Sequence, residues 1–502
     1  MIRTALAALA LLSVAPAVSV PKAWAAGTLR VGMESDVELL DPARSGGLPD
    51  RVVLAAVCDK LIDTTPGGDF APQLATAWAW SPDGLSLTLS LREGVRFHDG
   101  TPMDADAVRA NLERYRTDPK SVRKGELRPV TGVEVDGRTV RLRLSEPYAP
   151  LVAVLADRAG MMLSPAQIRN APDDASSRPA CAGPFRVTER VPQDHISLER
   201  FPDYWNAGAV SLDRVVYRFL PDSTVRLANL RAGALDMIER VAPADWADVS
   251  ADKRLRTYRT PSIAFRLVSF NVTGKTLLGR DARVRAAFVA SVDRATINQV
   301  AMDGVYVPAN QFEAVGTRYN DPALPVPPRN MDRAKALLAE AGVTGRVPVS
   351  MLVSNTPLDA QIGTMVQAMA SEAGFDVSIR TQEAVSGTEA MRRGDYETGM
   401  VIWSGRPDPD GNASIWLSCG GFVNFGKYCS KQMDELLAKG RTLTDPAARV
   451  PVYRDVAQLA AADVPYMVLY NPTWLWATSG KVSGFTPQSD GLMRMTGMQI
   501  AP

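Results

Sequence analysis

The sequence VPVSMLVSNTPLDAQIGTMVQAMASEAGFDVSIRTQEAVSGTEAMRRGDYETGMVIW, residues 347–403, decides the fold class of this chain. Apolar side chains alternate along its first residues, as they do on a strand. Gly374 ends the helical spacing that follows, because glycine is common just past a helix C-terminus. The stretch predicts alternating elements, namely strand 347–353, helix 359–373, strand 375–379, helix 388–393 and strand 399–403. Such units build an open α/β sheet covered by helices.

The same stretch also locates a candidate binding site. Ligands of open α/β sheets bind beyond the carboxyl ends of the strands. Here those ends lie near residues 354–357 and 403–410. We therefore expect ligand-binding side chains in these two loops.

The first third of the chain has a different, antiparallel character. Apolar residues alternate at 29–33 and 85–91, and Asp136-Gly137 separates two further alternating runs. Asp-Gly in that position is a strong hairpin signal. The remaining predicted elements are a helix at 105–115, a strand at 215–220 and helices at 281–303 and 332–341. An α+β region is therefore expected before the α/β region.

The first 25 residues have the pattern of a secretory signal peptide. Arg3 precedes a short apolar stretch, and Ala23-Trp24-Ala25 offers a small-x-small cleavage pattern. The alternative is a membrane anchor, but the apolar stretch is too short to cross a bilayer. We expect cleavage near Ala25 and release of the mature chain into the periplasm.

Length and charge narrow the class of protein. A chain of 502 residues is too long for one core, so two or three lobes are expected. The formal charge of +1 falls to −1 once Arg3 and Lys22 leave with the signal peptide. This near-neutral balance gives no electrostatic reason to expect nucleic acid as a partner.

Catalytic patterns are missing from the sequence. The two histidines, His98 and His195, have no metal-ligand spacing, and no nucleophile elbow, phosphate loop or dinucleotide fingerprint occurs. We therefore predict no enzyme, metal or cofactor. The alternative is a secreted hydrolase of peptides or glycosides, since carboxylates are plentiful and paired carboxylates suffice for glycoside hydrolysis.

Four cysteines in an exported chain suggest disulfides. Cys419 and Cys429 are close in sequence, with Gly420-Gly421 between them, which favours a small local loop and leaves Cys58 with Cys181. The alternative is four buried free thiols.

Several motifs resemble one family, the peptide/nickel class (family 5) of ABC-transporter solute-binding proteins. They run in family order over nearly the whole mature chain. These motifs are Phe97-His98-Asp99-Gly100-Thr101-Pro102, Cys181-Ala182-Gly183-Pro184-Phe185, Leu198-Glu199-Arg200-Phe201-Pro202-Asp203-Tyr204-Trp205, Val284-Arg285-Ala286-Ala287 with Asp293-Arg294, and Trp403-Ser404-Gly405 with Asp408-Pro409-Asp410.

The resemblance implies a type II periplasmic binding protein fold, with two α/β lobes around a ligand cleft and an additional α+β lobe. Lobe I is expected from residues 26–66, 182–274 and 479–502, the inserted lobe II from 67–181, and the closing lobe III from 275–478. It also implies a monomer that closes over a small ligand by hinge motion and docks on membrane permease subunits.

Two positions depart from the dipeptide-binding relatives. Those relatives carry an acid just after the Trp-Thr/Ser-Gly motif, where this chain has Arg406. They also use an arginine in the loop that here contains Asn355. Both departures favour a ligand with an anionic group, such as a modified peptide, an opine-like conjugate or a phosphorylated sugar.

Seven residues are candidate ligand contacts, each with a structural alternative. Trp403 stacks on the ligand or packs in the core, and Arg406 binds an anion or pairs internally with Asp408 or Asp410. Asp408 itself grips an amine or orients Arg406. The remaining candidates, for which ordinary surface or core is the alternative, are Asn355, Glu34, Asn271 and Phe422.

The sequence makes one covalent prediction that is directly testable. We expect the oxidised protein to carry Cys58–Cys181 and Cys419–Cys429, the second bridge contributing about 2–3 kcal/mol in the chain-entropy model. Peptide mapping without reduction tests both pairings, and free thiols at all four positions would contradict them.

Overall fold

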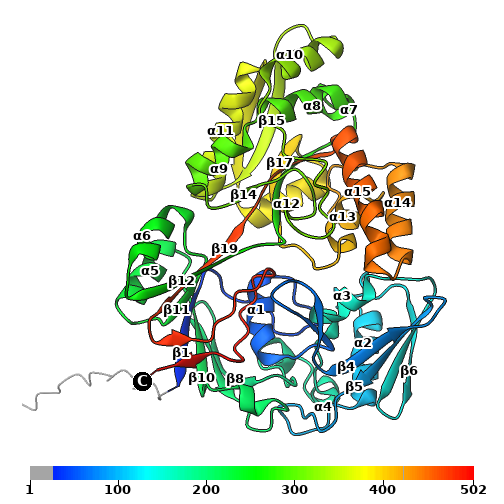
Figure 1. The fold of residues 1–502 in the computed structure, drawn as a ribbon, viewed down its shortest axis with the longest axis vertical. Helices are drawn as coiled ribbons and strands as arrows, with labels where there is room; N and C mark the ends of the chain where they lie inside the picture. The colour runs from blue at the N-terminus through cyan, green and yellow to red at the C-terminus, as the bar shows by residue number, and fades with distance from the viewer. Residues whose placement is uncertain (1–26, 422, 502) are drawn as a thin grey trace, which may run out of the picture.

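The computed structural model describes residues 27–421 and 423–501, so the predicted signal peptide lies outside the described residues. Three sheets of more than two strands organise the chain (Figure 1). A seven-stranded and a four-stranded sheet share one end of the molecule, and a six-stranded sheet occupies the other. This mixture of parallel and antiparallel sheets with covering helices confirms the predicted α/β fold class.

The seven-stranded sheet is built around β1 (Thr28–Met33), which pairs in parallel with β10 and β11. Its alternating Leu29, Val31 and Met33 are fully buried, as the sequence predicts. The strand order is β12 (Leu255–Pro261), β19 (Thr473–Ser479), β11 (Met237–Glu239), β1, β10 (Arg214–Phe219), β9 (His195–Arg200) and β8 (Phe185–Val191).

The six-stranded sheet contains the predicted alternating units. β15 pairs in parallel with both β16 and β17, and α8, α10 and α11 contribute to the core on one face. The strand order is β14 (Val307–Pro308), β18 (Tyr466–Asn471), β13 (Phe265–Phe270), β17 (Thr398–Trp403), β15 (Val347–Ser354) and β16 (Phe375–Gln382). The helices of this part are α7 (Leu277–Arg280), α8 (Ala282–Ser291), α9 (Arg294–Met302), α10 (Met331–Glu340), α11 (Pro357–Glu372), α12 (Ala384–Arg393), α13 (Asp410–Leu417), α14 (Lys431–Thr442) and α15 (Pro446–Asp463).

One predicted helix is two helices. The expected single helix at 281–303 breaks between α8 and α9, where Val292 has an extended backbone. Asp293 then caps α9 by accepting a hydrogen bond from the amide of Thr296. An N-cap aspartate satisfies an otherwise unpaired helix amide, so this residue starts a new helix rather than continuing the old one.

The four-stranded sheet contains the predicted hairpin. Asp136 pairs with Thr139 across the turn, and Leu87 and Leu89 of the alternating run are fully buried. The order is β4 (Ala75–Trp80), β5 (Ser86–Leu91), β7 (Thr139–Leu144) and β6 (Val130–Asp136), with α2 (Ala105–Thr117), α3 (Leu151–Leu155) and α4 (Pro165–Asn170) nearby. The small pairs are β2 (Ile62–Thr64) with β3 (Phe70–Pro72) and β20 (Val482–Ser483) with β21 (Gln499–Ile500), and the remaining helices are α1 (Leu48–Val57), α5 (Ser223–Arg231) and α6 (Trp246–Ala251).

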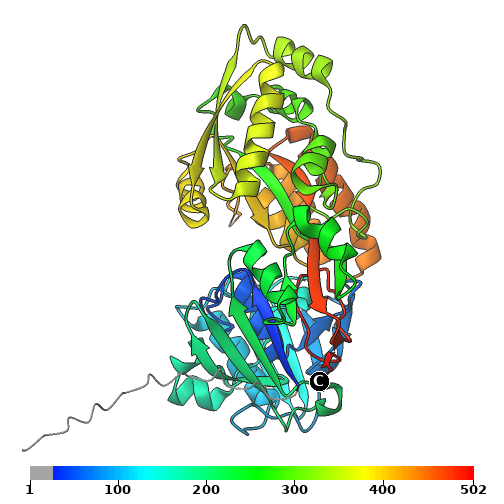
Figure 2. The same cartoon turned by 90° about the vertical axis from the view of Figure 1, so that its left-hand side faces the viewer.

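The chain crosses between the two large sheets at two adjacent places. It passes from β12 to β13 through residues 262–264, and it returns from β18 to β19 at Pro472 (Figures 1 and 2). β13 therefore pairs in the six-stranded sheet although it precedes the predicted lobe limit at residue 274. β19 pairs in the seven-stranded sheet although most of it precedes the limit at 478. The lobe limits themselves stay a prediction.

Both predicted disulfides form. Cys58, at the end of α1, bonds to Cys181, and Cys419 bonds to Cys429 after α13. No free cysteine occurs in the described part of the chain. The alternative of four free thiols is therefore wrong.

His98 joins two of the sequence motifs. Its Nδ1 accepts a hydrogen bond from the amide of Cys181 at 3.3 Å, and its Nε2 donates to the carbonyl oxygen of Gly183 at 3.0 Å. The imidazole packs edge-on against Phe201, with ring centroids 5.0 Å apart. Burial lowers the pKa of His98 to about 4. The histidine is therefore a neutral structural link, as its turn context indicates.

This link predicts acid sensitivity. The folded-state pKa of His98 lies below the ordinary value of about 6.5. The unfolded chain therefore binds more protons between those values, and stability is lost as pH falls from about 6.5 to about 4, by at most about 3 kcal/mol. We expect His98→Gln to flatten this part of the curve of unfolding free energy against pH.

Urea unfolding at several pH values measures the effect. His195→Gln is the matched control. His195 lies on β9 beside Asp194 and Glu189, away from the bonds that His98 makes with Cys181 and Gly183. This control should keep the loss of stability on acidification. An unchanged slope in His98→Gln would contradict the assignment.

Candidate functional site

The loop that follows β17 is held in one conformation by an asparagine. Asn412 Oδ1 accepts hydrogen bonds from the Arg406 amide at 2.7 Å and from Trp403 Nε1 at 3.2 Å, and Asn412 Nδ2 donates to the Arg406 carbonyl oxygen at 2.9 Å. Gly405 has φ +78°, and a Cβ there would lie 2.2 Å from the Ile263 carbonyl oxygen. Glycine is therefore required at the turn that presents Arg406.

Arg406 faces another part of the chain. Its guanidinium lies over the Trp403 ring, 4.4 Å from the centroid, and its Nε is 3.8 Å from Asp157 Oδ2. Its Nη1 donates to Ser404 Oγ and to the Gly405 carbonyl oxygen. The side chain is 21% exposed. Burial lowers the pKa of Arg406, while the charge of Asp157 opposes that shift.

The internal partners considered for Arg406 are engaged elsewhere. Asp408 binds Arg449 through both oxygens, and Asp410 pairs with Arg441 and accepts a hydrogen bond from Ser414. The structural alternative, in which Arg406 pairs with Asp408 or Asp410, is therefore wrong. Its acidic neighbour is Asp157, which lies far away in sequence.

Asp408 is placed as a structural residue. The carboxylate and the Arg449 guanidinium are 6% and 5% exposed, and Arg449 also donates to the Gly440 carbonyl oxygen. A carboxylate with two charge-assisted hydrogen bonds from one arginine has little capacity left for a ligand amine. Asp408 thus binds Arg449 rather than Arg406, and its bonds favour a structural role.

Asn271 also has internal partners. Its Nδ2 donates to the carbonyl oxygens of Tyr396 and Gly394, and its Oδ1 accepts from Thr273. The side chain is 6% exposed. These bonds favour the structural alternative for Asn271.

The other candidates divide by exposure. Asn355 is exposed directly after β15, before the Thr356 cap of α11. Glu34 follows β1 and pairs with Arg240, both side chains being more than one third exposed. Phe422 lies outside the described residues. Asn355 and Glu34 are thus accessible, whereas Asp408 and Asn271 are not.

Two residues near Asn355 were missed by the sequence analysis. Arg266 on β13 forms a buried ion pair with Asp359 in the first turn of α11. Ile402, opposite Arg266 in the pairing of β13 with β17, is 50% exposed. Strand alternation signals Ile402 only weakly, and no local pattern pairs Arg266 with Asp359.

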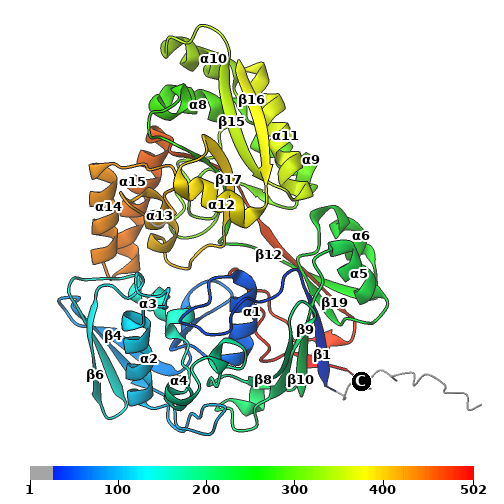
Figure 3. The same ribbon diagram turned by 180° about the vertical axis from the view of Figure 1, so that it is seen from behind.

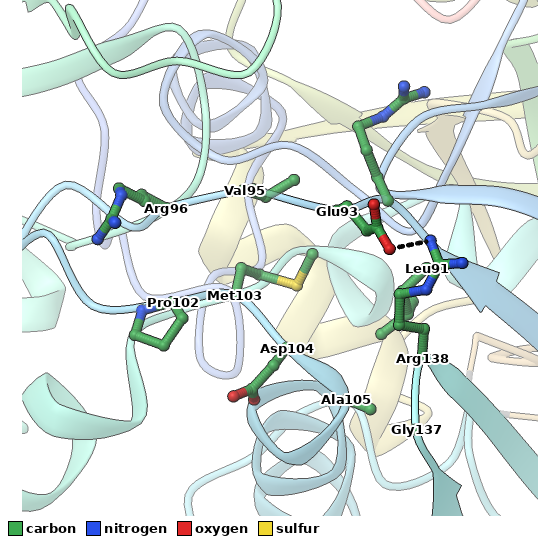
Figure 4. A pocket seen from close by; sticks show the side chains of 12 residues that line it. Leu91, Glu93, Val95, Arg96, Pro102, Met103, Asp104, Ala105, Gly137 and Arg138 are labelled. Carbon is green, nitrogen blue, oxygen red and sulfur yellow. Dashed lines mark ion pairs between the residues drawn. The ribbon is translucent and has the colours of Figure 1, made fainter.

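A surface pocket of about 260 Å³ lies elsewhere, beside the four-stranded sheet (Figure 4). Its lining includes Met103, Asp104 and an exposed ion pair between Glu93 and Arg138. It contains none of the predicted ligand contacts. In the described residues no group of three or more His, Cys, Asp and Glu side chains is placed to hold a metal ion.

Comparison with known proteins decides the family. The model of "Bacterial extracellular solute-binding proteins, family 5 Middle" matches residues 69–424. The chain belongs to this family.

Curated relatives of this family 5 protein match along most of their length. The chain is 26% identical over 487 residues to the "Glutathione-binding protein GsiB" of Escherichia coli O1:K1, covering 94% of both chains. It is 28% identical over 484 residues to the protein of the same name from Pectobacterium atrosepticum, covering 93% of both.

Solved structures agree with the fold. The binding protein AgaA from A. tumefaciens R10, solved with agropinic acid, is 26% identical with a TM-score of 0.82, covering 95% of this chain and 99% of that one. The ABC transporter substrate-binding protein CtaP of Listeria monocytogenes, at 22% identity and a TM-score of 0.86, covers 95% and 100% and supports the fold alone.

Family membership sets aside the hydrolase alternative. This family 5 protein is the solute-binding component of an ABC importer, works outside the cytoplasm and is not an enzyme. In the described residues no helix is both long and apolar enough to cross a membrane.

The Asp408–Arg449 pair predicts a stability effect. Removing one partner of a buried ion pair leaves the other charge uncompensated, at a cost of about 3–5 kcal/mol. We expect Asp408→Ala to lower the unfolding free energy by that amount, as measured by urea denaturation.

An exposed pair supplies the matched control. Glu435→Ala removes the partner of Lys431 on α14, where both side chains are mostly exposed. This change should cost about 1 kcal/mol or less. Equal effects of the two substitutions would show that Asp408 is not a structural residue.

Proposed function

We propose that the chain captures a peptide or peptide-like solute with an anionic group in the periplasm and delivers it to the permease of an ABC importer. The observation that carries this proposal is Arg406. Its side chain is one fifth exposed, lies on the loop that follows β17, and stacks over the aromatic ring of Trp403. A planar guanidinium recognises a carboxylate or phosphate through two parallel hydrogen bonds.

The ligands named for the relatives support this class of solute. Glutathione is a tripeptide with two carboxylates, and agropinic acid is an acid. The proposed contacts in this chain are Trp403, Arg406, Asn355 and Glu34. Trp403 contributes a partly exposed aromatic face, which is a common lining of small-molecule sites.

Closure of the protein is part of the proposal. We place the first and third lobes on the seven-stranded and six-stranded sheets, with lobe II inserted in the first; in the described residues the chain passes between these two sheets at the two strand crossovers. Hinge motion about these connections brings Arg406 and Trp403 over a ligand bound on the other side. A signal peptide cleaved near Ala25 and a monomeric state complete the proposed periplasmic protein.

Closure predicts compaction without chemistry. Small-angle X-ray scattering of the mature protein should show a smaller radius of gyration with saturating ligand than without it. Glutathione is the first probe, and chromatography of the released probe should recover it unchanged. Recovery of an altered solute after long incubation would reject a binding function.

Arg406 predicts the charge preference. Loss of the guanidinium leaves the anionic group of the ligand desolvated and unpaired, at a cost of about 2–5 kcal/mol of affinity. We expect Arg406→Ala to weaken glutathione binding by that amount in calorimetric titrations. Arg406→Lys should also weaken it, because lysine keeps the charge but loses the planar fork.

An exposed arginine of the same sheet region is the control. Arg393, at the end of α12, pairs with Asp395, and both side chains are 62% exposed. Arg393→Ala should leave affinity unchanged. Near-wild-type affinity in both Arg406 variants would end the proposed role.

A further inference from the structure

Asp157 is surrounded by four arginines that come from different parts of the chain. Arg51 lies on α1, Arg123 in the loop after α2, Arg158 next to Asp157, and Arg406 on the loop after β17. Arg51, Arg123 and Arg158 are only 2%, 5% and 3% exposed. We call these four arginines the arginine cluster.

The acids in contact with the arginine cluster do not balance its charge. Asp157 Oδ1 accepts a hydrogen bond from Arg51 Nε at 2.9 Å, and Asp157 Oδ2 is 3.8 Å from Arg406 Nε. Among the described residues the other acid in direct contact is Glu126, 2.7 Å from Arg123 Nη1; Asp490 interacts with Arg51 at longer range but is bound by Arg494. Four guanidinium groups thus share two carboxylates, and an excess of buried positive charge is costly unless an anion compensates it.

Several buried donors at this place have no hydrogen-bond partner. They are Arg51 Nη1, Arg123 Nε, Arg158 Nε and Ser45 Oγ. The Ser45 carbonyl oxygen accepts from both Arg123 and Arg158, so the loop before α1 is drawn into the cluster. Buried donors without an acceptor are rare in folded proteins because each one costs free energy, so a bound group that accepts these hydrogen bonds would be stabilised here.

The protonation behaviour agrees with an excess of positive charge. Burial lowers the pKa of Arg158 to about 9; Asp157 opposes that shift, while Arg123, Arg406 and Arg51 add to it. Burial acts to raise the pKa of Asp157, but the four arginines hold it well below its usual value.

We infer that the arginine cluster is an anion site that holds a carboxylate or phosphate group of the ligand beside Asp157. This inference deepens the proposed function and rests on it. Three of its arginines lie with the seven-stranded and four-stranded sheets, whereas Arg406 lies with the six-stranded sheet. An anion bound between them therefore links the two sides of the crossovers and favours the closed arrangement.

Asp157 has a specific role in this site. It occupies Arg51 and faces Arg406 as an internal carboxylate, and thus competes with a ligand anion. Removing its charge should strengthen binding of small anions, whereas a purely structural network should lose stability without any gain of anion affinity. The two interpretations predict opposite results for one substitution.

The test uses small anions, so that it does not depend on the peptide part of the ligand. Succinate and inorganic phosphate are titrated calorimetrically into the mature protein and its variants. We expect Asp157→Asn to raise the affinity for at least one of them about tenfold, and Arg406→Gln and Arg51→Gln to lower it at least tenfold. Glu126→Gln, which removes the other contacting carboxylate, is measured in parallel and should also raise the affinity.

Arg318→Gln is the matched control. Arg318 also reaches from the six-stranded part to an acid beyond the crossovers, 3.5 Å from Asp69, but lies outside the cluster and is exposed. It should leave anion affinity unchanged. Unchanged or lower anion affinity in both acid-to-amide variants would overturn the inference.

Titrations with glutathione on the same samples separate the two proposals. Glutathione binding and compaction without any effect of the cluster variants on small anions would overturn the anion site and leave the proposed function standing. Anion binding with the expected variant effects, but no peptide-like ligand and no compaction, would support the site and reject the proposed function.

Discussion

The double strand crossover fixes how the seven-stranded and six-stranded sheets are connected, and the proposed binding site depends on this connection. β12 pairs with β19 in one large sheet, and β13 pairs with β18 in the other, so two antiparallel strands run side by side from sheet to sheet. Backbone and side-chain bonds fasten the crossing, with the Ser262 amide donating to the Pro472 carbonyl oxygen and Asn471 Nδ2 donating to the Ala264 carbonyl oxygen. The chain thus links the two sheets at this crossing, which is where we propose that the hinge lies.

Side-chain and backbone contacts away from the crossing also join the two sides of this division. Besides Arg406 with Asp157, they include the exposed Arg318–Asp69 pair and an amide bond from Ala149 to the Arg441 carbonyl oxygen, where α14 stands above α3 (Figures 1 and 3). Exposed ion pairs are worth about 0–1 kcal/mol. Opening the exposed Arg318–Asp69 pair therefore costs little.

The sequence predicted the elements whose signals are local. Alternation located β1, β5 and β15, Asp-Gly located the hairpin of β6 and β7, and cysteine spacing located the bridge after α13. The helix at 281–303 was wrong because apolar spacing continues through Val292, and only the capping role of Asp293 marks the break. The sequence alone does not show that β13 and β19 belong to different sheets from the strands just before them, because both look like ordinary buried strands.

The site was predicted less completely, because its geometry depends on distant residues. The loop after β17 and its arginine could be found from a motif. Nothing near Asp408 reveals that Arg449 binds it, and nothing near Arg406 reveals Asp157 or the three arginines around that acid. Asn271 directly follows a strand, but its side chain donates to Tyr396 and Gly394 in the connection between α12 and β17. Which side chains pair across such long stretches of sequence is decided by the tertiary fold.

Native mass spectrometry tests the central claim, capture of an anionic peptide-like solute, most directly. The mature protein is incubated with a mixed extract of small metabolites, freed of unbound solute and measured intact. The account predicts one non-covalent adduct of small mass that is released on denaturation, contains a peptide-like linkage and carries a carboxylate or phosphate. An adduct that is neutral or cationic, or a covalent or chemically processed product, would contradict it.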